Sequence, residues 1–421
     1  MESFNSTVAT FLNPQGPDAL PLPRVSFGAV NRSGTFKYLK TFGDDAQPGH
    51  NADPSDDVDV LWTIASSTKF ITTIAALQCV DKGLLTLDGD IGDVLPEWKN
   101  PKILTGFTES DEPIFVPAKN TVTLRRLLSH NSGIAYAFES PTLQKYQELR
   151  GPQPHPTTVK EAYELFLVEE PGTKWMYSPG MDWAGLMHHC QIERVTNLPL
   201  GAYMQQNIFT PLSLSPDSIL YHPDRHPSLL ARQAATFRRD ATTGSILNRI
   251  PDPSAPTADD FGGGGLVATA PALLAIYAAI LRCCNDDDEK NEEEKNSRIL
   301  STAMVDEIFS PQLSAQSRKG LASIENVDPG ALCGVPRGAA IQYGLGGLLN
   351  LEDVEGGRRR KRGSIAWSGM RNYYFWIDRE GGVAGLQAMH MLPCGDEKTV
   401  ELLNAFERAV YAAVGAEPGG E

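Results

Sequence analysis

The β-strand signals of this chain lie at its two ends and enclose a middle that has mainly helical patterns. Near the start, Val25–Arg32 and Thr35–Phe42 are β-rich and are joined across Ser33-Gly34, a pair that supplies the positive φ of a tight hairpin. Strand periods return after residue 340, with turn residues at hairpin spacing. They predict antiparallel neighbours at 343–351, 364–368, 373–378 and 382–391. We expect one sheet interrupted by a long insertion.

The insertion and the end of the chain carry the helical signals. An apolar pattern runs from Ser66 through Cys79 and stops at Gly83. Other helix starts are predicted at Thr123, at the capping box of Thr158 and Glu161, near Asp182 and at Thr269, with an amphipathic helix over 398–414. These patterns predict an α+β fold for the 421 residues.

We expect a single catalytic domain with two lobes. The sheet lobe covers about 20–60 and 335–418, and the helical lobe covers about 61–334. An acidic segment at 285–296 is low in apolar residues and is predicted as an exposed loop of the helical lobe.

The charge balance excludes two classes of partner. A formal net charge of −15 disfavours sequence-independent binding to nucleic acid or to an anionic membrane, because both need excess Lys and Arg on one face. The one basic run, Arg358–Arg362, is flanked by Glu352, Glu355 and the Gly356-Gly357 pair. We predict a solvated hairpin tip there.

The first residues, Met1–Pro14, lack the positive and apolar regions of a signal peptide, and no apolar run is long enough to span a membrane. We therefore expect a cytoplasmic protein. Its six cysteines show no C-x-x-C spacing, which in a reducing compartment indicates thiols rather than disulfides.

The tetrad Ser66-Ser67-Thr68-Lys69 stands where a helix is predicted to begin. A spacing of three places Lys69 one turn along on the same face as Ser66, within reach of the hydroxyl proton. The helix N-terminus also favours a developing oxyanion. A motif this short occurs by accident, so the alternative is a serine helix cap followed by a surface lysine.

The motifs of phosphate binding, of the α/β-hydrolases and of metal binding are absent or poorly formed. Gly262–Gly265 is not followed by the Lys and Ser or Thr of a phosphate loop, and no G-x-S-x-G elbow is present. The adjacent His188 and His189 point about 100° apart on a helix and make a poor metal site. We predict neither metal nor cofactor. His130 is expected to stabilise a turn.

Several sequence blocks that occur in a fixed order support a catalytic role for Ser66 and Lys69. They are Ile64–Lys69, Leu84–Asp88, Leu127–Gly133, Tyr177-Ser178-Pro179, Gly262–Leu266 and Trp367-Ser368-Gly369. Over roughly residues 25 to 415 the chain resembles the penicillin-recognising serine hydrolase superfamily. It is most similar to the esterase and fungal transesterase branch, of the lovastatin acyltransferase type, which is related to class C β-lactamases. The resemblance implies the β-lactamase/transpeptidase-like fold, with an antiparallel sheet flanked by helices and a mainly helical second lobe.

The resemblance also implies a role for each matching position. Ser66 would be the nucleophile, Lys69 the group that accepts or relays its proton, and Tyr177 the second acid/base. The backbone N–H groups of Ser66 and Met370 would form the oxyanion hole, and the strand Trp367-Ser368-Gly369 would bind substrate. For Tyr177 the alternative is a core aromatic whose hydroxyl is satisfied.

Two departures from the β-lactamase pattern bear on the substrate. Pro179 stands where lactamases have Asn, and Trp367 stands where they have Lys, so the polar anchors of a β-lactam are missing. The indole offers a flat apolar wall instead. We predict a serine acyltransferase that moves an acyl group from a small-molecule or carrier-bound thioester, or an ester, to an alcohol of a lipophilic, polyketide-like metabolite. Ester hydrolysis and a catalytically silent ligand-binding homologue are the alternatives.

Aromatic residues near these motifs are candidates for the pocket wall, but strand alternation and the needs of the core leave their roles open. They are Tyr136, Phe138, Trp175, Trp183, Tyr373, Tyr374, Phe375 and Trp376.

Overall fold

The computed structural model describes residues 1–14, 21–45, 58–187, 198–240, 242–244, 247–251, 255–284, 298–327, 332–356 and 359–415. The acidic segment predicted as a loop, 285–296, lies outside these residues, as do His188 and His189. Within the described ranges, no helix is long and apolar enough to cross a membrane. No disulfide joins the five cysteines found there.

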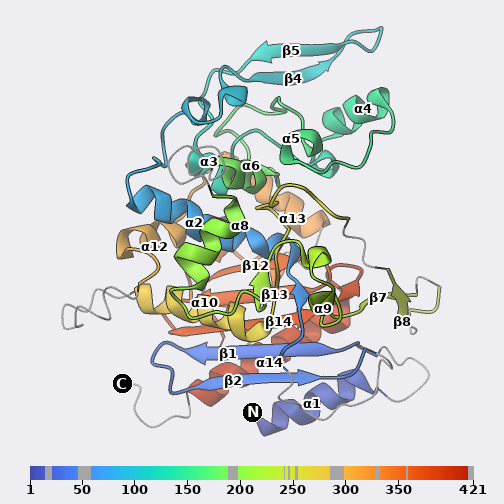
Figure 1. Ribbon diagram of the computed structural model, residues 1–421, viewed down its shortest axis with the longest axis vertical. Helices are drawn as coiled ribbons and strands as arrows, with labels where there is room; N and C mark the ends of the chain where they lie inside the picture. Colours follow the sequence, from blue (N-terminus) through green and yellow to red (C-terminus); the bar gives the residue numbers. More distant parts are fainter. Residues whose placement is uncertain are drawn as a thin grey trace.

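A seven-stranded sheet is built from both ends of the chain (Figure 1). Each strand is antiparallel to its neighbours, and the N-terminal hairpin pairs with the C-terminal strands, with Phe27 opposite Gln387. The prediction of one sheet interrupted by an insertion is confirmed. In spatial order the strands are β10 (Ile341–Tyr343), β11 (Leu348–Asn350), β12 (Ile365–Gly369), β13 (Tyr373–Asp378), β14 (Val383–Met389), β1 (Val25–Asn31) and β2 (Lys37–Phe42).

Helices cover both faces of this sheet (Figure 1). On one face lie α1 (Glu2–Leu12) and α14 (Glu397–Val414), which share a core with β1, β13 and β14. On the other face lie α10 (Ala270–Cys283) and α2 (Thr68–Asp81), which belong to the larger core of the helical lobe. This arrangement agrees with the expected α+β class.

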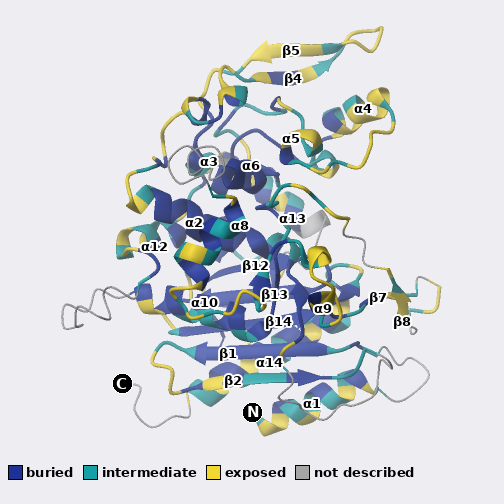
Figure 2. Ribbon diagram, in the orientation of Figure 1, coloured by how far each residue is buried: buried dark blue, intermediate teal, exposed yellow. Residues whose placement is uncertain are grey.

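The helical lobe stands on the second face and becomes more exposed with distance from the sheet (Figure 2). A small sheet of order β3-β9-β6 lies inside it, and an exposed hairpin, β4–β5, lies at its far end. The remaining elements are β3 (Trp62–Thr63), β4 (Lys102–Phe107), β5 (Pro113–Pro117), α3 (Leu124–Leu128), α4 (Pro141–Arg150), α5 (Val159–Ala162), α6 (Gly180–Met187), α8 (Leu200–Met204), β6 (Ile219–Leu220), α9 (Pro227–Leu230), β7 (Thr236–Arg239), β8 (Leu247–Ile250), β9 (Val267–Ala268), α12 (Thr302–Ile308), α13 (Ala322–Val327) and β15 (Met391–Leu392).

Two predicted elements differ from the structure. The strand expected at 343–351 is two strands, because the chain turns at 344–347, where Gly346 has φ of 82°. The Thr158–Glu161 capping box forms as predicted, but its helix ends at Ala162, because Tyr163 takes an extended conformation. The caps Thr123 and Thr269 are confirmed.

The basic run is not a solvated hairpin tip, and that prediction was wrong. Arg359 and Arg360 are buried, and both bind Glu407 of α14, with Nη2–Oε2 distances of 2.9 and 3.1 Å. Among the described residues of the run, 359–362, the last two, Lys361 and Arg362, are exposed. The partner lies far along the chain, so the local sequence contains no sign of it.

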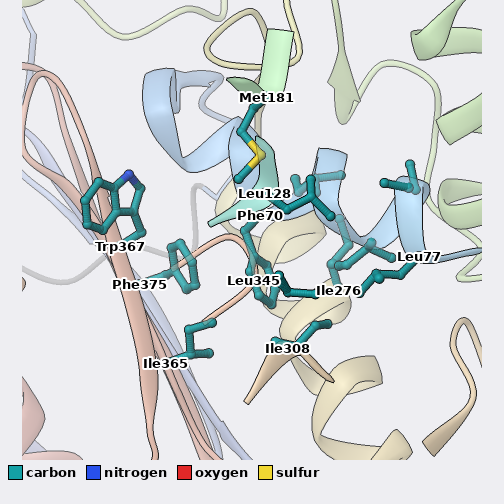
Figure 3. Packing of buried hydrophobic residues seen from close by; sticks show 14 of the residues in the cluster. Phe70, Leu77, Leu128, Met181, Ile276, Ile308, Leu345, Ile365, Trp367 and Phe375 are labelled. Carbon is teal, nitrogen blue, oxygen red and sulfur yellow. The ribbon is translucent and has the colours of Figure 1, made fainter. Parts of the chain in front are cut away.

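Core packing fixes the position of α2 against the sheet (Figure 3). The ring of Phe70, in the first turn of α2, lies 5.0 Å from the ring of Phe375 on β13. Phe375 is paired in turn with Trp367 on β12. The start of α2 is thereby held next to β12, and the candidate site lies at that junction.

Candidate active site

Ser66 lies in a tight turn between β3 and α2. The 3-10 turn Ala65–Ser67 leads directly into the helix, and Ala65 has φ of 43°, a strained value for a residue with a Cβ. A side chain at position 369 would collide with the Ile64 carbonyl, so Gly369 allows the end of β12 to approach this turn. Ser66 is therefore set between a helix N-terminus and a sheet strand.

The amine of Lys69 is buried and makes three contacts. Its Nζ donates to the hydroxyl of Ser66 at 3.2 Å, to the carbonyl oxygen of Gly263 at 2.7 Å and to the hydroxyl of Tyr136 at 3.3 Å. The side chain is fully buried in α2, so the alternative of a surface lysine is excluded. The spacing of three places the amine against Ser66, as the sequence predicts.

The glycine run positions the carbonyl that Lys69 binds. Gly262 accepts from Thr72 at 2.8 Å, and the N–H of Gly263 donates to Asp182 Oδ1 at 2.8 Å. A side chain at position 263 would collide with the Asp182 carboxylate. Burial raises the pKa of Asp182, while the Lys69 charge and the Gly263 N–H oppose the shift. The run therefore contributes to the site through its backbone.

Tyr177 lies across the cavity on the turn that precedes α6. The Lys69 amine is 4.8 Å from the centre of its ring. The next residue, Ser178, donates its N–H to Nδ1 of the buried His130 at 3.2 Å. Burial, and then the charge of Lys69, lower the pKa of His130 well below 6.5, so the ring is neutral and serves as an acceptor. This agrees with the turn-stabilising role predicted for His130.

Tyr136, which the sequence analysis named only as a candidate for the pocket wall, contacts Lys69 directly. Its hydroxyl accepts from Lys69, and its N–H donates to the Tyr177 carbonyl at 3.0 Å. Burial raises its pKa well above 10, with the charges of Tyr163 and Asp182 adding to the shift, so it stays a neutral phenol. It follows the block Leu127–Gly133, but no motif marks it.

The predicted residues surround one cavity of about 730 Å³. Ser66, Tyr177, Trp367, Ser368 and Met370 line it, whereas Gly369 lies behind the lining against Ile64. Three of the candidate aromatics also line it, and the other five pack in the cores. The three are Tyr136, Phe138 and Trp175, and the five are Trp183, Tyr373, Tyr374, Phe375 and Trp376.

The wall is predominantly aromatic near Ser66. Trp367 is 2% exposed, and its ring lies 5.5 Å from that of Tyr177. The lining also includes acidic Glu139 and Asp224, and a histidine, His222, that no motif indicated. Such a cavity suits an apolar ligand with few polar groups.

Comparison with known proteins agrees with this geometry. The family model described as Beta-lactamase matches residues 27–390. Lovastatin esterase of Penicillium rubens is 34% identical over 400 residues, covering 93% of this chain and 94% of the relative. Monacolin J acid methylbutanoyltransferase of Aspergillus terreus is 29% identical over 403 residues, covering 93% and 92%.

A solved structure shows the same fold. Simvastatin synthase (LovD) from Aspergillus terreus, in its LovD6 mutant form, superposes with a TM-score of 0.81 at 28% identity, covering 99% of this chain and 96% of that one. The predicted fold and the resemblance are thus confirmed. With the Ser66–Lys69 pair in place and nearly the whole chain matched, the protein belongs to the beta-lactamase family.

Proposed function

We propose that this protein is a serine acyltransferase that works through an acyl-Ser66 intermediate. The observation that carries the proposal is the Lys69 amine, buried and 3.2 Å from the Ser66 hydroxyl at the edge of a cavity of about 730 Å³. The relatives named as a methylbutanoyltransferase and an esterase support acyl transfer as the reaction class.

In the first half-reaction, Ser66 Oγ attacks the carbonyl carbon of an ester or thioester while Lys69 takes the hydroxyl proton. The resulting oxyanion would be bound by the backbone N–H groups of Ser66 and Met370. Collapse of the intermediate breaks the bond to the leaving group, which receives a proton from Tyr177. In the second half, an alcohol gives its proton to the Tyr177 oxygen and attacks the acyl carbon, and the bond to Ser66 Oγ breaks as Lys69 returns its proton to that oxygen.

The choice of Tyr177 over Tyr136 for proton return has a physical basis. The pKa of Tyr136 is raised well above 10 by burial, and its hydroxyl is engaged by Lys69. Both phenols are partly exposed and line the cavity, so the difference between them is that the Tyr136 hydroxyl already accepts from Lys69. Tyr177 is therefore the phenol assigned to the leaving group.

The strand Trp367-Ser368-Gly369 would hold a lipophilic substrate along the aromatic wall, and Gly369 would bring that strand close to Ser66. We propose a polyketide-like alcohol as acceptor and a small or carrier-bound thioester as donor. β-Lactams should be poor substrates, because Pro179 and Trp367 replace the anchors for the lactam amide and carboxylate.

Ester hydrolysis is the second candidate, and the 34% identity to lovastatin esterase favours it. The two differ only in whether water or an alcohol resolves the acyl-serine. A transferase must hold its acceptor in near-attack geometry and exclude water.

A partition assay tests the proposal. The enzyme is loaded with a short-chain thioester and offered a panel of polycyclic alcohols, and ester product is measured against free acid by mass spectrometry. We expect ester to exceed acid with at least one acceptor. Dominant free acid with every acceptor, together with rapid cleavage of the preformed esters, would identify a hydrolase.

Labelling by a fluorophosphonate provides the complementary test. Labelling of the wild type that is lost in Ser66→Ala supports the nucleophile assignment. Absence of labelling in the wild type would favour a catalytically silent ligand-binding protein.

A further inference from the structure

The imidazole of His222 reaches the same cavity from the small β3-β9-β6 sheet of the helical lobe. In this sheet β9 lies between β3 and β6, with Thr63 opposite Val267 and Leu220 opposite the same Val267. Both outer strands are antiparallel to β9, so they run in the same direction. Ser66 follows β3 and His222 follows β6, and both leave the sheet at the same end.

The sheet sets the separation of these two residues. Neighbouring strands lie about 4.8 Å apart, so β3 and β6 are separated by roughly 10 Å. Ser66 and His222 both line the cavity. The imidazole is therefore placed beyond contact with the reacting carbonyl and within reach of a distant part of the same bound molecule.

The imidazole is held in one orientation. Its Nε2 lies 2.7 Å from Asp260 Oδ1, and the other carboxylate oxygen of Asp260 accepts the N–H of Gly201 at 2.8 Å. Both side chains are 11% exposed. His222 also has φ of 54°, an uncommon value for a residue with a Cβ. A histidine on the surface needs none of these three features, which are burial, an anchored carboxylate partner and a strained backbone.

This orientation determines what the imidazole offers to a ligand. Because the carboxylate of Asp260 accepts the proton on Nε2, the other ring nitrogen, Nδ1, is left for a ligand: it accepts a hydrogen bond in the neutral ring and donates one in the protonated ring, and a hydroxyl group can pair with either. Near the imidazole lie Asp224, which lines the cavity, and Arg225, which donates to the Thr257 carbonyl at 3.0 Å. Elsewhere the lining carries the acidic Glu139 and Asp182 and the basic Arg371. Because acidic side chains predominate in the lining, the surroundings favour a neutral hydroxyl over a carboxylate.

We propose that His222, positioned by Asp260, binds a hydroxyl group of the substrate roughly 10 Å from Ser66. This proposal rests on the proposed function, since it assigns a subsite to the same cavity. His222 would be the group that contacts substrate, and Asp260 would act through it as a positioning residue.

The test uses esters that differ by one hydroxyl. One series consists of p-nitrophenyl ω-hydroxyalkanoates of increasing chain length, and a second consists of ω-hydroxyalkyl butyrates, each with its unsubstituted counterpart. We measure the ratio of kcat/KM for the hydroxylated ester over its counterpart. In the wild type we expect this ratio to peak at one chain length in at least one series.

Substitutions test whether His222 causes the preference for the hydroxylated ester. His222→Phe should lower the peak ratio about tenfold, the effect of one lost hydrogen bond. Asp260→Ala should lower it in the same direction, whereas His222→Gln retains an acceptor and should restore part of it. The matched control is His226→Phe, at an exposed histidine outside the cavity lining, which should keep the wild-type ratio. Thermal unfolding midpoints verify that each variant is folded.

The outcomes separate this proposal from the proposed function. A labelled, active wild type with no peak in either series, or with a peak that His222→Phe leaves intact, overturns the subsite and leaves the acyltransferase proposal standing. If fluorophosphonate does not label the wild type, the acyltransferase proposal fails. The same ester pairs are then compared by calorimetric binding, and loss of the hydroxyl preference in His222→Phe supports the subsite, while its persistence overturns it.

Discussion

The two faces of the seven-stranded sheet bury polar groups in different ways. The face under α1 and α14 is mostly aromatic and aliphatic, with the rings of Phe4, Phe27 and Phe406 within 5.1 Å of one another. The face under the helical lobe buries Lys69, Asp182 and other polar residues next to an open cavity. Buried polar groups destabilise a fold unless they are paired, so their partners indicate their purpose.

On the first face the main buried charge is fully paired. Glu407 has no exposed surface and binds both Arg359 and Arg360. Burial alone would raise its pKa, but the two guanidinium groups more than offset this and hold the pKa below 4.5.

On the second face the Lys69 amine contacts neutral oxygens and the Ser66 hydroxyl. We infer that the first face is built for stability and the second for chemistry.

The sharpest test of this comparison is Ser66→Ala against Ser67→Ala. We expect Ser66→Ala to lower kcat at least 10⁴-fold with little change in unfolding free energy, because it removes the nucleophile from the cavity. Ser67 is buried but faces away from the cavity, so Ser67→Ala should keep a substantial part of the activity. Turnover and acyl-enzyme mass are measured together. An inactive Ser67→Ala with an active Ser66→Ala would refute the proposed nucleophile.

Glu407→Gln tests the opposite face. Removing its charge leaves two buried guanidinium groups without their counterion, and we expect a loss of about 3–5 kcal/mol in unfolding free energy. The matched control is Glu401→Gln on the same helix, whose pair with Lys398 is exposed and should contribute about 0.5 kcal/mol or less. Urea denaturation measures both. Equal losses in the two variants would contradict the division between the faces.

Lys69→Ala and Tyr177→Phe test the proton-transfer partners. Each should lower kcat by about 10² or more while the fold is kept, since each removes a partner for the moving proton. Steady-state kinetics and circular dichroism measure the two effects. In a shared relay the double variant should not be worse than the product of the single effects, and a much greater loss argues against that relay.

The features predicted correctly from the sequence are those that depend on residues close together in the chain. The hairpin at β1 and β2, the cap at Thr269 and the Ser66–Lys69 pair each depend on residues within a few positions. The family relationship, and with it the acyl-transfer class, followed from several such blocks in order.

Features that depend on distant partners were missed or misjudged. Arg359 and Arg360 were assigned to solvent because Glu407 lies 48 and 47 residues away, respectively. His222 and Asp260 stand in no motif, and Tyr136 was named only as a candidate for the pocket wall, because only the folded chain brings these residues to the cavity region and to their partners. The β4–β5 hairpin was missed because β5 is exposed, so it lacks the alternation of a half-buried strand.

The smallest expected effect concerns His130, which is buried on the second face. Its pKa in the folded protein is well below 6.5, whereas in the unfolded chain it has the ordinary value. As the pH falls below about 6.5, the unfolded chain therefore binds a proton that the folded protein does not, and folding stability is lost. The slope should approach about 1.4 kcal/mol per pH unit. Stability is fully present above this window.

Other buried groups also have shifted pKa values in the folded protein, so the measurement is a difference between variants. The pKa of Asp182 is raised by burial, and a folded-state carboxyl with a raised pKa gains stability as the pH falls, which opposes the His130 effect. We therefore compare urea denaturation at pH values from about 7 to about 5 in the wild type and in His130→Gln. His130→Gln should be less stable throughout, because it loses the acceptor for Ser178, but its stability should fall less steeply with pH. The exposed His155→Gln should retain the wild-type slope. Parallel slopes in all three proteins would show that His130 is not the group that is kept neutral by burial, and that the second face tolerates a charge there.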